Sequence, residues 1–116
     1  MGDNAIDLKE FMERVQDDKE LLVELLDIYQ EDFIEKRTAL GDAATKSDLE
    51  QIKSVAHSMK GSSGNISAKG LHALCLRIEQ SAKSGDANIG PLLTEMDQLF
   101  TKVKEQIIEI KREFKG

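Results

Sequence analysis

Apolar side chains recur every three or four residues along most of this chain, and no stretch shows the strict alternation that is typical of a half-buried strand. A spacing of three and four residues places these side chains on one face of an α-helix. Four long segments have this pattern, over residues 19–44, from residue 49 to between Gly64 and Ser67, over 68–83, and from Pro91 nearly to the terminus. A shorter segment, residues 4–15, repeats it. The sequence therefore predicts four long helices preceded by a short one.

Polar residues predict where these helices start and stop. Asp17 with Glu20, and Ser47 with Glu50, have the spacing of a capping box, in which each of the two side chains accepts a hydrogen bond from the other residue's backbone N–H. Residues 84–86, Ser-Gly-Asp, favour a turn after the helix over 68–83. We therefore expect helices that are joined by short connections.

Helices of this kind cannot each bury an apolar face alone, so they must pack against one another. With short connections, the economical arrangement is an antiparallel four-helix bundle, which makes the fold all-α. The 116 residues are the length of one domain, and we expect a single helical-bundle domain over 1–116 with the short N-terminal helix capping it. The single cysteine, Cys75, falls on an apolar stripe and is predicted to lie in the core.

The composition excludes several classes of function. A net charge of −6 argues against general nucleic-acid binding, which requires a basic surface. No stretch reaches the roughly 20 apolar residues that a membrane-spanning helix needs, so we expect no membrane insertion. The start of the sequence lacks a basic segment followed by an apolar run, which makes the cytoplasm the default location.

One histidine, His57, falls away from the apolar stripe of its helix. Its neighbours at a spacing of three, four and seven residues are basic or small: Lys53, Lys60, Gly61 and Gly64. A glycine inside a helix is less favourable than alanine by roughly 1 kcal/mol, so two glycines one turn apart are a poor choice for stability alone. Uncovered backbone beside a histidine lets another surface approach the imidazole.

The second histidine, His72, lies on the flank of the next apolar stripe and lacks the lysine and glycine companions of His57 in the sequence. We therefore predict a solvated or partly packed side chain without a chemical role. Two histidines, with no Glu-x-x-His pair, cannot assemble a di-iron carboxylate site. No metal site is expected.

The segment around His57 reads AHSMKGSSGNISA. It resembles the phosphorylated segment of the histidine-containing phosphotransfer (Hpt) domains of two-component phosphorelays, in which a histidine is followed by lysine and glycine at the third and fourth positions and then by small residues. The matching residues are His57, Lys60, Gly61, Ser62 and Ser63. Ser67 stands where the family commonly has a second glycine, at the expected end of the helix. The family fold is a helical bundle, in agreement with the apolar pattern.

The resemblance implies a phosphoryl carrier. His57 would accept a phosphoryl group from an aspartate on the receiver domain of a response regulator or hybrid sensor kinase, and would pass it to another receiver. Lys60 would counter the charge of the phosphate, while Lys53, Gly61 and Gly64 would form the surface for the partner. The resemblance also implies that this chain binds no cofactor, because the magnesium ion belongs to the receiver.

Three other functions fit the sequence less well. The chain has no P-loop and no protein-kinase signature set, so we expect no ATP-dependent kinase activity of its own. The dimerisation helices of sensor kinases follow their histidine with an acidic residue and soon a proline, whereas Ser58 follows His57 and no proline is near. A helical interaction module without phosphotransfer stays the alternative, and the glycine-flanked His57 with Lys60 argues against it.

Overall fold

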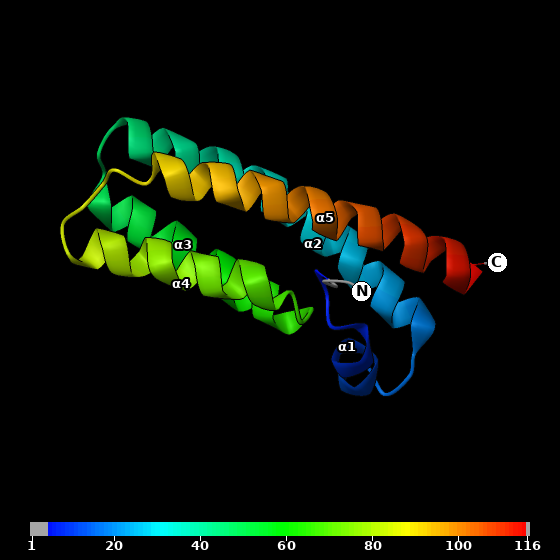
Figure 1. Cartoon of the computed structure of the whole chain (residues 1–116). Coiled ribbons are helices and arrows are strands. Elements are labelled where there is room, and N and C mark those ends of the chain that lie inside the picture. Colours follow the sequence, from blue (N-terminus) through cyan, green and yellow to red (C-terminus); the bar gives the residue numbers. More distant parts are fainter. Residues whose placement is uncertain (1–4, 116) are drawn as a thin grey trace.

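The computed structural model describes residues 5–115, and within this range the protein consists of five α-helices and no strands. The helices are α1 (Leu8–Arg14), α2 (Lys19–Thr45), α3 (Leu49–Asn65), α4 (Lys69–Lys83) and α5 (Gly90–Lys115) (Figure 1). The predicted all-α fold is confirmed, and the four long helices begin and end within about two residues of the expected positions. The expected short helix over 4–15 is present as α1, although Asn4 lies outside the described residues.

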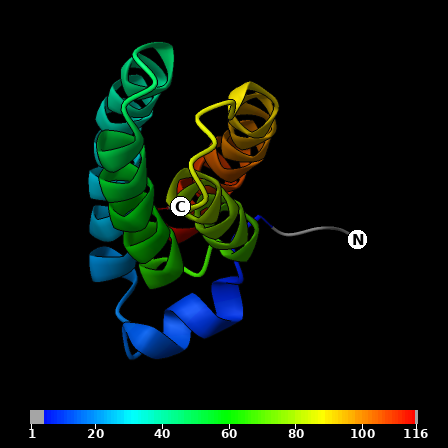
Figure 2. The same ribbon diagram turned by 90° about the vertical axis from the view of Figure 1, so that its left-hand side faces the viewer.

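Helices α2 to α5 run antiparallel to their neighbours, with α3 packed between α2 and α4, and with α5 packed on α2 and α4 (Figures 1 and 2). The two longest helices, α2 and α5, extend beyond the shorter pair α3 and α4. Helix α1 lies across the bundle beside this extension, near the end of α3 and the start of α4. The fold is therefore a four-helix bundle in which α3 and α4 pack on each other and on the two long helices.

The apolar faces of all five helices meet in one core. Between α2 and α5, Phe33 and Phe100 stack with ring centroids 3.9 Å apart, and Tyr29 lies beside both rings. The hydroxyl of Tyr29 shares a buried hydrogen bond of 2.8 Å with Ser63 on α3. Cys75 is fully buried, which confirms the core position, and burial raises the pKa of its thiol to about 12.

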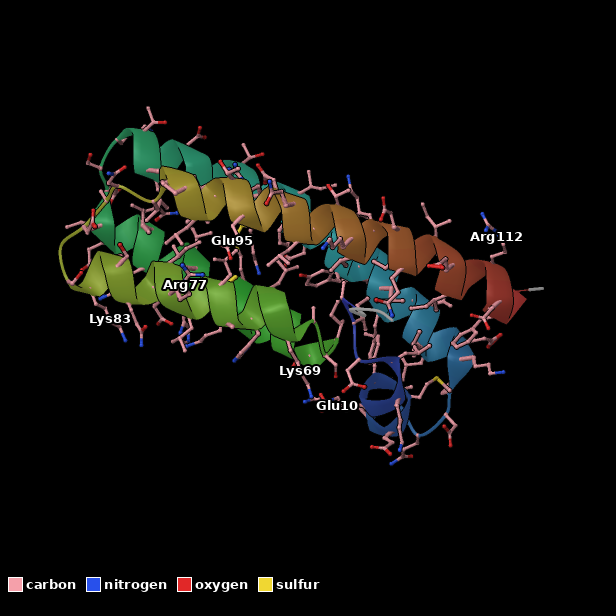
Figure 3. The ribbon with its side chains drawn as sticks, in the orientation of Figure 1. Glu10, Lys69, Arg77, Lys83, Glu95 and Arg112 are labelled. Carbon is pink, nitrogen blue, oxygen red and sulfur yellow. The ribbon has the colours of Figure 1, made fainter. Side chains whose placement is uncertain are left out.

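Charged side chains cover the outer faces of the helices (Figure 3). The pair Arg77 and Glu95, separated by 3.4 Å, links α4 to α5 at the surface. Such exposed pairs contribute little to stability, roughly 0 to 1 kcal/mol. None of the helices in the described part of the chain is both long enough and apolar enough to cross a membrane.

The predicted capping residues of α2 and α3 are wrong by one position. Asp18 and Asp48 cap these helices, and their carboxylates accept hydrogen bonds from the backbone N–H groups of Leu21 and Gln51 at 3.0 and 3.1 Å. The expected caps have left-handed backbones, with φ of 63° at Asp17 and 53° at Ser47. They end the preceding helix in a Schellman turn, and the next residue starts the new helix.

The same turn ends α3 at Ser67, where φ is 61°. The backbone N–H groups of Ala68 and Ser67 donate to the carbonyls of Ser63 and Gly64 at 2.9 and 3.0 Å. A left-handed backbone favours glycine, which explains the glycine that the family commonly has here. Serine is held in this conformation by its side chain, because the buried hydroxyl donates to Glu10 Oε1 at 2.6 Å.

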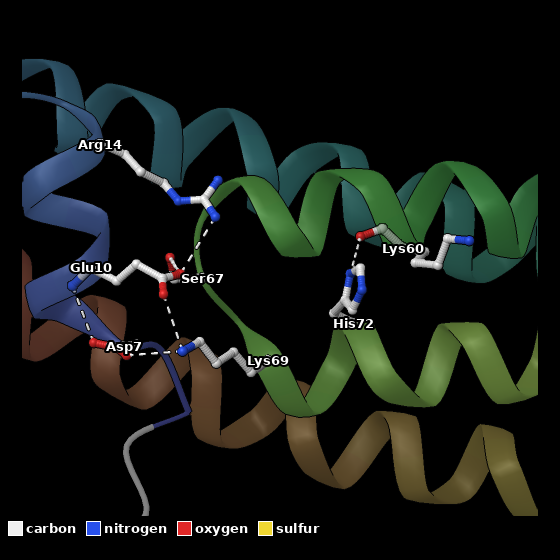
Figure 4. A network of polar contacts seen from close by, with 7 residues as sticks. All are labelled: Asp7, Glu10, Arg14, Lys60, Ser67, Lys69 and His72. Atoms are coloured by element: carbon white, nitrogen blue, oxygen red, sulfur yellow. Dashed lines mark hydrogen bonds and ion pairs between the residues drawn. The ribbon is translucent and has the colours of Figure 1, made fainter.

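Helix α1 is attached to this turn by further polar contacts (Figure 4). The backbone N–H of Asp7 donates to the carbonyl of Ser67 at 2.9 Å, and Lys69 Nζ lies 3.1 Å from Glu10 and 3.3 Å from Asp7. Hydrogen bonds from Ser67 and Lys69 hold the pKa of the Glu10 carboxyl below its usual range. Helix α1 thus covers the end of the bundle at the turn where the histidine-bearing helix stops.

Candidate functional site

His57 lies in the middle of α3, on the side opposite the buried residues Ile52, Val55 and Met59. Its side chain is 68% exposed, as the helical spacing predicted. Because the core residues on the same helix fix the orientation of α3, the imidazole is presented to solvent by a rigid element. A partner can therefore reach the ring without any rearrangement of the bundle.

A buried carboxylate on α4 holds the inner side of this imidazole. Glu79 Oε2 lies 2.9 Å from His57 Nδ1, and Glu79 Oε1 lies 2.7 Å from Lys60 Nζ. The side chain of Glu79 is only 6% exposed, so both of its oxygens find their partners within the protein. Lys60 contacts this carboxylate, and its expected role in countering the charge of a phosphate stays a prediction. The three side chains form one cluster, which we call the Glu79 cluster.

The hydrogen bond to Glu79 determines which imidazole nitrogen is free. The hydrogen bond from Lys60 holds the pKa of the Glu79 carboxyl below its usual range, against the effect of burial, and the hydrogen bond with His57 adds to this. An ionised carboxylate only accepts hydrogen bonds, so Nδ1 of His57 must carry the proton. In the neutral ring the lone pair is therefore on Nε2.

Glu79 is the site residue that the sequence analysis missed. It follows Cys75 by four residues and precedes Ala82 by three, and both of these side chains are buried. Glu79 thus lies on the apolar stripe of α4. A charged residue is rarely buried unless it has a partner, so a glutamate within a buried stripe was a signal that could have been used.

The two glycines near His57 have different surroundings. Gly61 lies inside α3 and is exposed, and a Cβ added there would meet no atom within 4 Å, which confirms that it is a helical residue on the open face. At Gly64 a Cβ would lie 3.1 Å from Nδ1 of His72. The space beside Gly64 is therefore filled by His72, and the role of Gly64 in partner binding stays a prediction. Lys53 Nζ lies 3.6 Å from Glu50, and its role in partner binding also stays a prediction.

His72 is exposed, as predicted, and its ring lies across the gap between α4 and α3 (Figure 4). Its Nδ1 is 3.0 Å from the backbone carbonyl of Lys60. Antiparallel packing brings the backbone of Lys60 and of Gly64 to this ring, although neither residue is near His72 in the sequence. Within residues 5–115, no charged side chain pairs with the ring of His72.

Among residues 5–115, no three histidine, cysteine, aspartate or glutamate side chains are placed to hold a metal ion. The chemistry that the Glu79 cluster offers is nucleophilic. The cluster has an exposed imidazole nitrogen with a lone pair, a buried negative charge behind the ring and an ammonium group bound to that charge. Such a nitrogen can attack an electrophile that a partner brings to the surface.

Two solved structures resemble this chain over nearly their whole length. Histidine-containing phosphotransfer protein B (HptB) from Pseudomonas aeruginosa PAO1 has 27% sequence identity and a TM-score of 0.84, and the match covers 98% of this chain and 97% of that one. The HPT domain of the Hpt sensor hybrid histidine kinase from Shewanella has 18% identity and a TM-score of 0.80, with 95% and 96% covered. At that identity the second likeness concerns the fold. No curated protein matches the chain in sequence.

The sequence model of the Hpt domain matches residues 24–112. This range includes most of α2 and α5, all of α3 and α4, and the whole Glu79 cluster. Helix α1 precedes it. Because the match spans most of the chain, the protein belongs to the Hpt domain family.

Proposed function

We propose that this protein carries phosphoryl groups in a multistep phosphorelay by accepting them on Nε2 of His57. Membership of the Hpt family assigns the carrier role, and the resemblance to HptB supports it. The observation that supports His57 as the acceptor is its geometry: the ring is exposed while its Nδ1 is bound to buried Glu79. The donors and acceptors are receiver domains of response regulators or hybrid sensor kinases.

In the transfer step, the lone pair of Nε2 attacks the phosphorus of an aspartyl phosphate on the receiver. The N–P bond forms while the P–O bond to the aspartate breaks, and the electron pair of that bond leaves with the carboxylate. Nδ1 keeps its proton, so the phosphorylated ring is positively charged and faces the negative charge of Glu79. The return step to a second receiver reverses these bond changes.

Phosphoryl transfer depends mostly on positioning and on neutralisation of charge, so one helix face can suffice when the partner supplies the metal ion. We expect that ion, Mg²⁺, to come with the receiver domain. Gly61, one turn from His57, leaves the backbone uncovered where the receiver would approach. We propose a carrier without ATP-dependent kinase activity of its own, in keeping with the Hpt family and with a sequence that has neither a P-loop nor the protein-kinase signature set.

The test is transfer from a receiver carrying radioactive aspartyl phosphate, in the presence of Mg²⁺, to the wild-type protein and to two glutamine variants. His57→Gln should stay helical and take up no label, while the matched variant His72→Gln should be labelled like the wild type. Label on folded His57→Gln would refute the assignment. A receiver that binds the wild-type protein without transferring label would favour a plain interaction module.

A further inference from the structure

We propose that two copies of this chain form a dimer by exchanging their N-terminal arms, residues 5–15. In the monomer, the arm folds back on its own bundle through the hinge, which consists of Gln16 and Asp17. In the dimer, each arm occupies the same place on the bundle of the second copy. The inference does not depend on the phosphoryl-acceptor role of His57.

The hinge holds two successive residues in a conformation that side chains disfavour. The backbone φ is 55° at Gln16 and 63° at Asp17, so both residues are left-handed although neither is glycine. A residue with a Cβ normally visits this conformation singly and at a cost in free energy. Both residues are exposed, and within residues 5–115 neither side chain makes a hydrogen bond or an ion pair. Ser67, by contrast, is held in the same conformation by Glu10. The hinge is therefore strained without a compensating side-chain contact.

The arm is bound to the bundle by its backbone and by apolar side chains. Gln106 on α5 binds both backbone groups of Ile6: Oε1 accepts from the N–H at 2.7 Å, and Nε2 donates to the carbonyl at 2.9 Å. The side chains of Ile6, Phe11 and Val15 are buried in the common core. The arm thus has a specific site on the bundle rather than a loose contact with it.

Polar contacts at the turn between α3 and α4 complete this site (Figure 4). The Ser67 carbonyl accepts from the backbone N–H of Asp7, and the Ser67 hydroxyl donates to Glu10. Lys69 Nζ lies 3.1 Å from Glu10 and 3.3 Å from Asp7. None of these contacts involves the hinge. Each of them can therefore form equally well with an arm that comes from a second copy.

Exchange keeps the contacts of the arm and removes the strain of the hinge. In the dimer, the hinge passes from one bundle to the other and can adopt an ordinary right-handed or extended backbone. The opposing term is the lost independent motion of two chains, which matters less as the concentration rises. Short hinges under strain favour this kind of exchange in general. The partner that fits the arm site is therefore the arm of a second copy.

The first test measures the dimer by sedimentation velocity. Wild-type protein should be monomeric at about 10 µM and should form dimers toward about 1 mM, because a short tether gives a bound segment an effective concentration of that order and strain lowers it. Asp17→Pro cannot close the hinge, since proline fixes its own φ at about −65° and restricts Gln16 before it. This variant should be dimeric already at about 10 µM. A folded Asp17→Pro that stays monomeric up to about 1 mM would overturn the inference.

Glycine in the hinge should have the opposite effect. Gln16→Gly combined with Asp17→Gly removes the strain of the closed hinge and should lower the fraction of dimer at about 1 mM by about tenfold. Ser47→Gly, at the left-handed turn between α2 and α3, is the matched control and should leave this fraction unchanged. Equal fractions for the double glycine variant and the wild type would overturn the inference, because strain in the hinge would then play no part.

A mixture of two charge variants shows whether exchanged arms make the dimer, and it leaves the hinge intact. Glu10→Lys and Lys69→Glu each place like charges at the contact between the arm and α4 within one chain. Arms exchanged between the two variants restore opposite charges at both contacts. Mixed dimers should then outnumber each like dimer about tenfold, compared with about twofold for random pairing. Native mass spectrometry of the two chains refolded together, one of them ¹⁵N-labelled, measures this ratio. Random pairing would show that the dimer is built on another surface and would overturn the inference.

Discussion

The two histidines of this protein lie in the same gap between α3 and α4, and both use Nδ1 to bind across it. His57 binds a buried carboxylate, and the nearby Gly61 is open to solvent. His72 binds a neutral carbonyl and fills the space beside Gly64. Exposure alone therefore does not distinguish them. The difference lies in the partner behind each ring, because only a negative charge can compensate a ring that becomes a cation.

The largest effect that we expect outside the acceptor itself comes from closing the open glycine. Gly61→Gln places a long side chain where the receiver would approach His57, and transfer should fall roughly 100-fold, as expected when reacting groups are misplaced by an ångström or more. The bundle should stay folded, because no atom lies within 4 Å of the new Cβ. Rates of label transfer, measured beside circular dichroism, check this. Unchanged transfer would mean that the open face is not used for docking.

Glu79→Gln should have the next largest effect. Glutamine keeps the shape of the side chain but removes the charge behind the ring. We expect the transfer rate to fall about tenfold, the low end of the range found when the partner that orients a metal-binding histidine is replaced. His72→Gln is the matched change on the other ring and should alter the rate by less than about twofold. Equal rates for Glu79→Gln and the wild-type protein would show that the buried charge does not distinguish the two histidines.

The apolar pattern predicted the bundle because burial of one helix face depends on local spacing, which the sequence displays directly. The predicted capping positions were wrong by one residue because Asp17 and Ser47 adopt left-handed backbones, which a sequence without glycine at these positions does not indicate. Glu79 was missed for a different reason. Its partners are 19 and 22 residues away on another helix, so only the packing of α3 on α4 shows that its charge is compensated.

Replacing Gly61 or Gly64 by alanine should change the free energy of unfolding by different amounts, because the two glycines have different surroundings. Gly61→Ala should raise the free energy of unfolding by up to about 1 kcal/mol, because alanine is the better helix former and the new Cβ is unopposed. At Gly64 the same gain should be offset, because the His72 ring must shift by a few tenths of an ångström from a Cβ 3.1 Å away. This shift weakens the hydrogen bond of His72 to the Lys60 carbonyl, and such a bond is worth about 1 kcal/mol.

Chemical denaturation of both alanine variants measures this difference. Adding His72→Ala should restore the gain at Gly64 and leave Gly61→Ala unaffected. Equal stabilisation of the two single variants would show that the His72 ring shifts without loss of stability. Gly64 would then not be needed to make room for His72.

The smallest effect that we expect is a loss of the stability contributed by Glu79 at acidic pH. The pKa of Glu79 is lowered in the folded protein, so its contribution to stability is complete above the unfolded value of about 4.5 and is lost as the pH falls through the lower folded value. The difference in unfolding free energy between the wild-type protein and Glu79→Gln should therefore shrink as the pH falls from about 6 to about 3. The carbonyl behind His72 does not titrate in this range. A constant difference for Glu79→Gln would mean that this carboxyl is not ionised in the fold.

The most direct test of the central claim is to identify the phosphorylated nitrogen. Protein labelled by a phosphorylated receiver can be studied by ³¹P NMR together with long-range ¹H–¹⁵N correlations from the two histidine rings. We expect a single phosphohistidine at His57, with phosphorus on Nε2 and the proton still on Nδ1 beside Glu79. Phosphorus on Nδ1 of His57, or on either nitrogen of His72, would contradict the account.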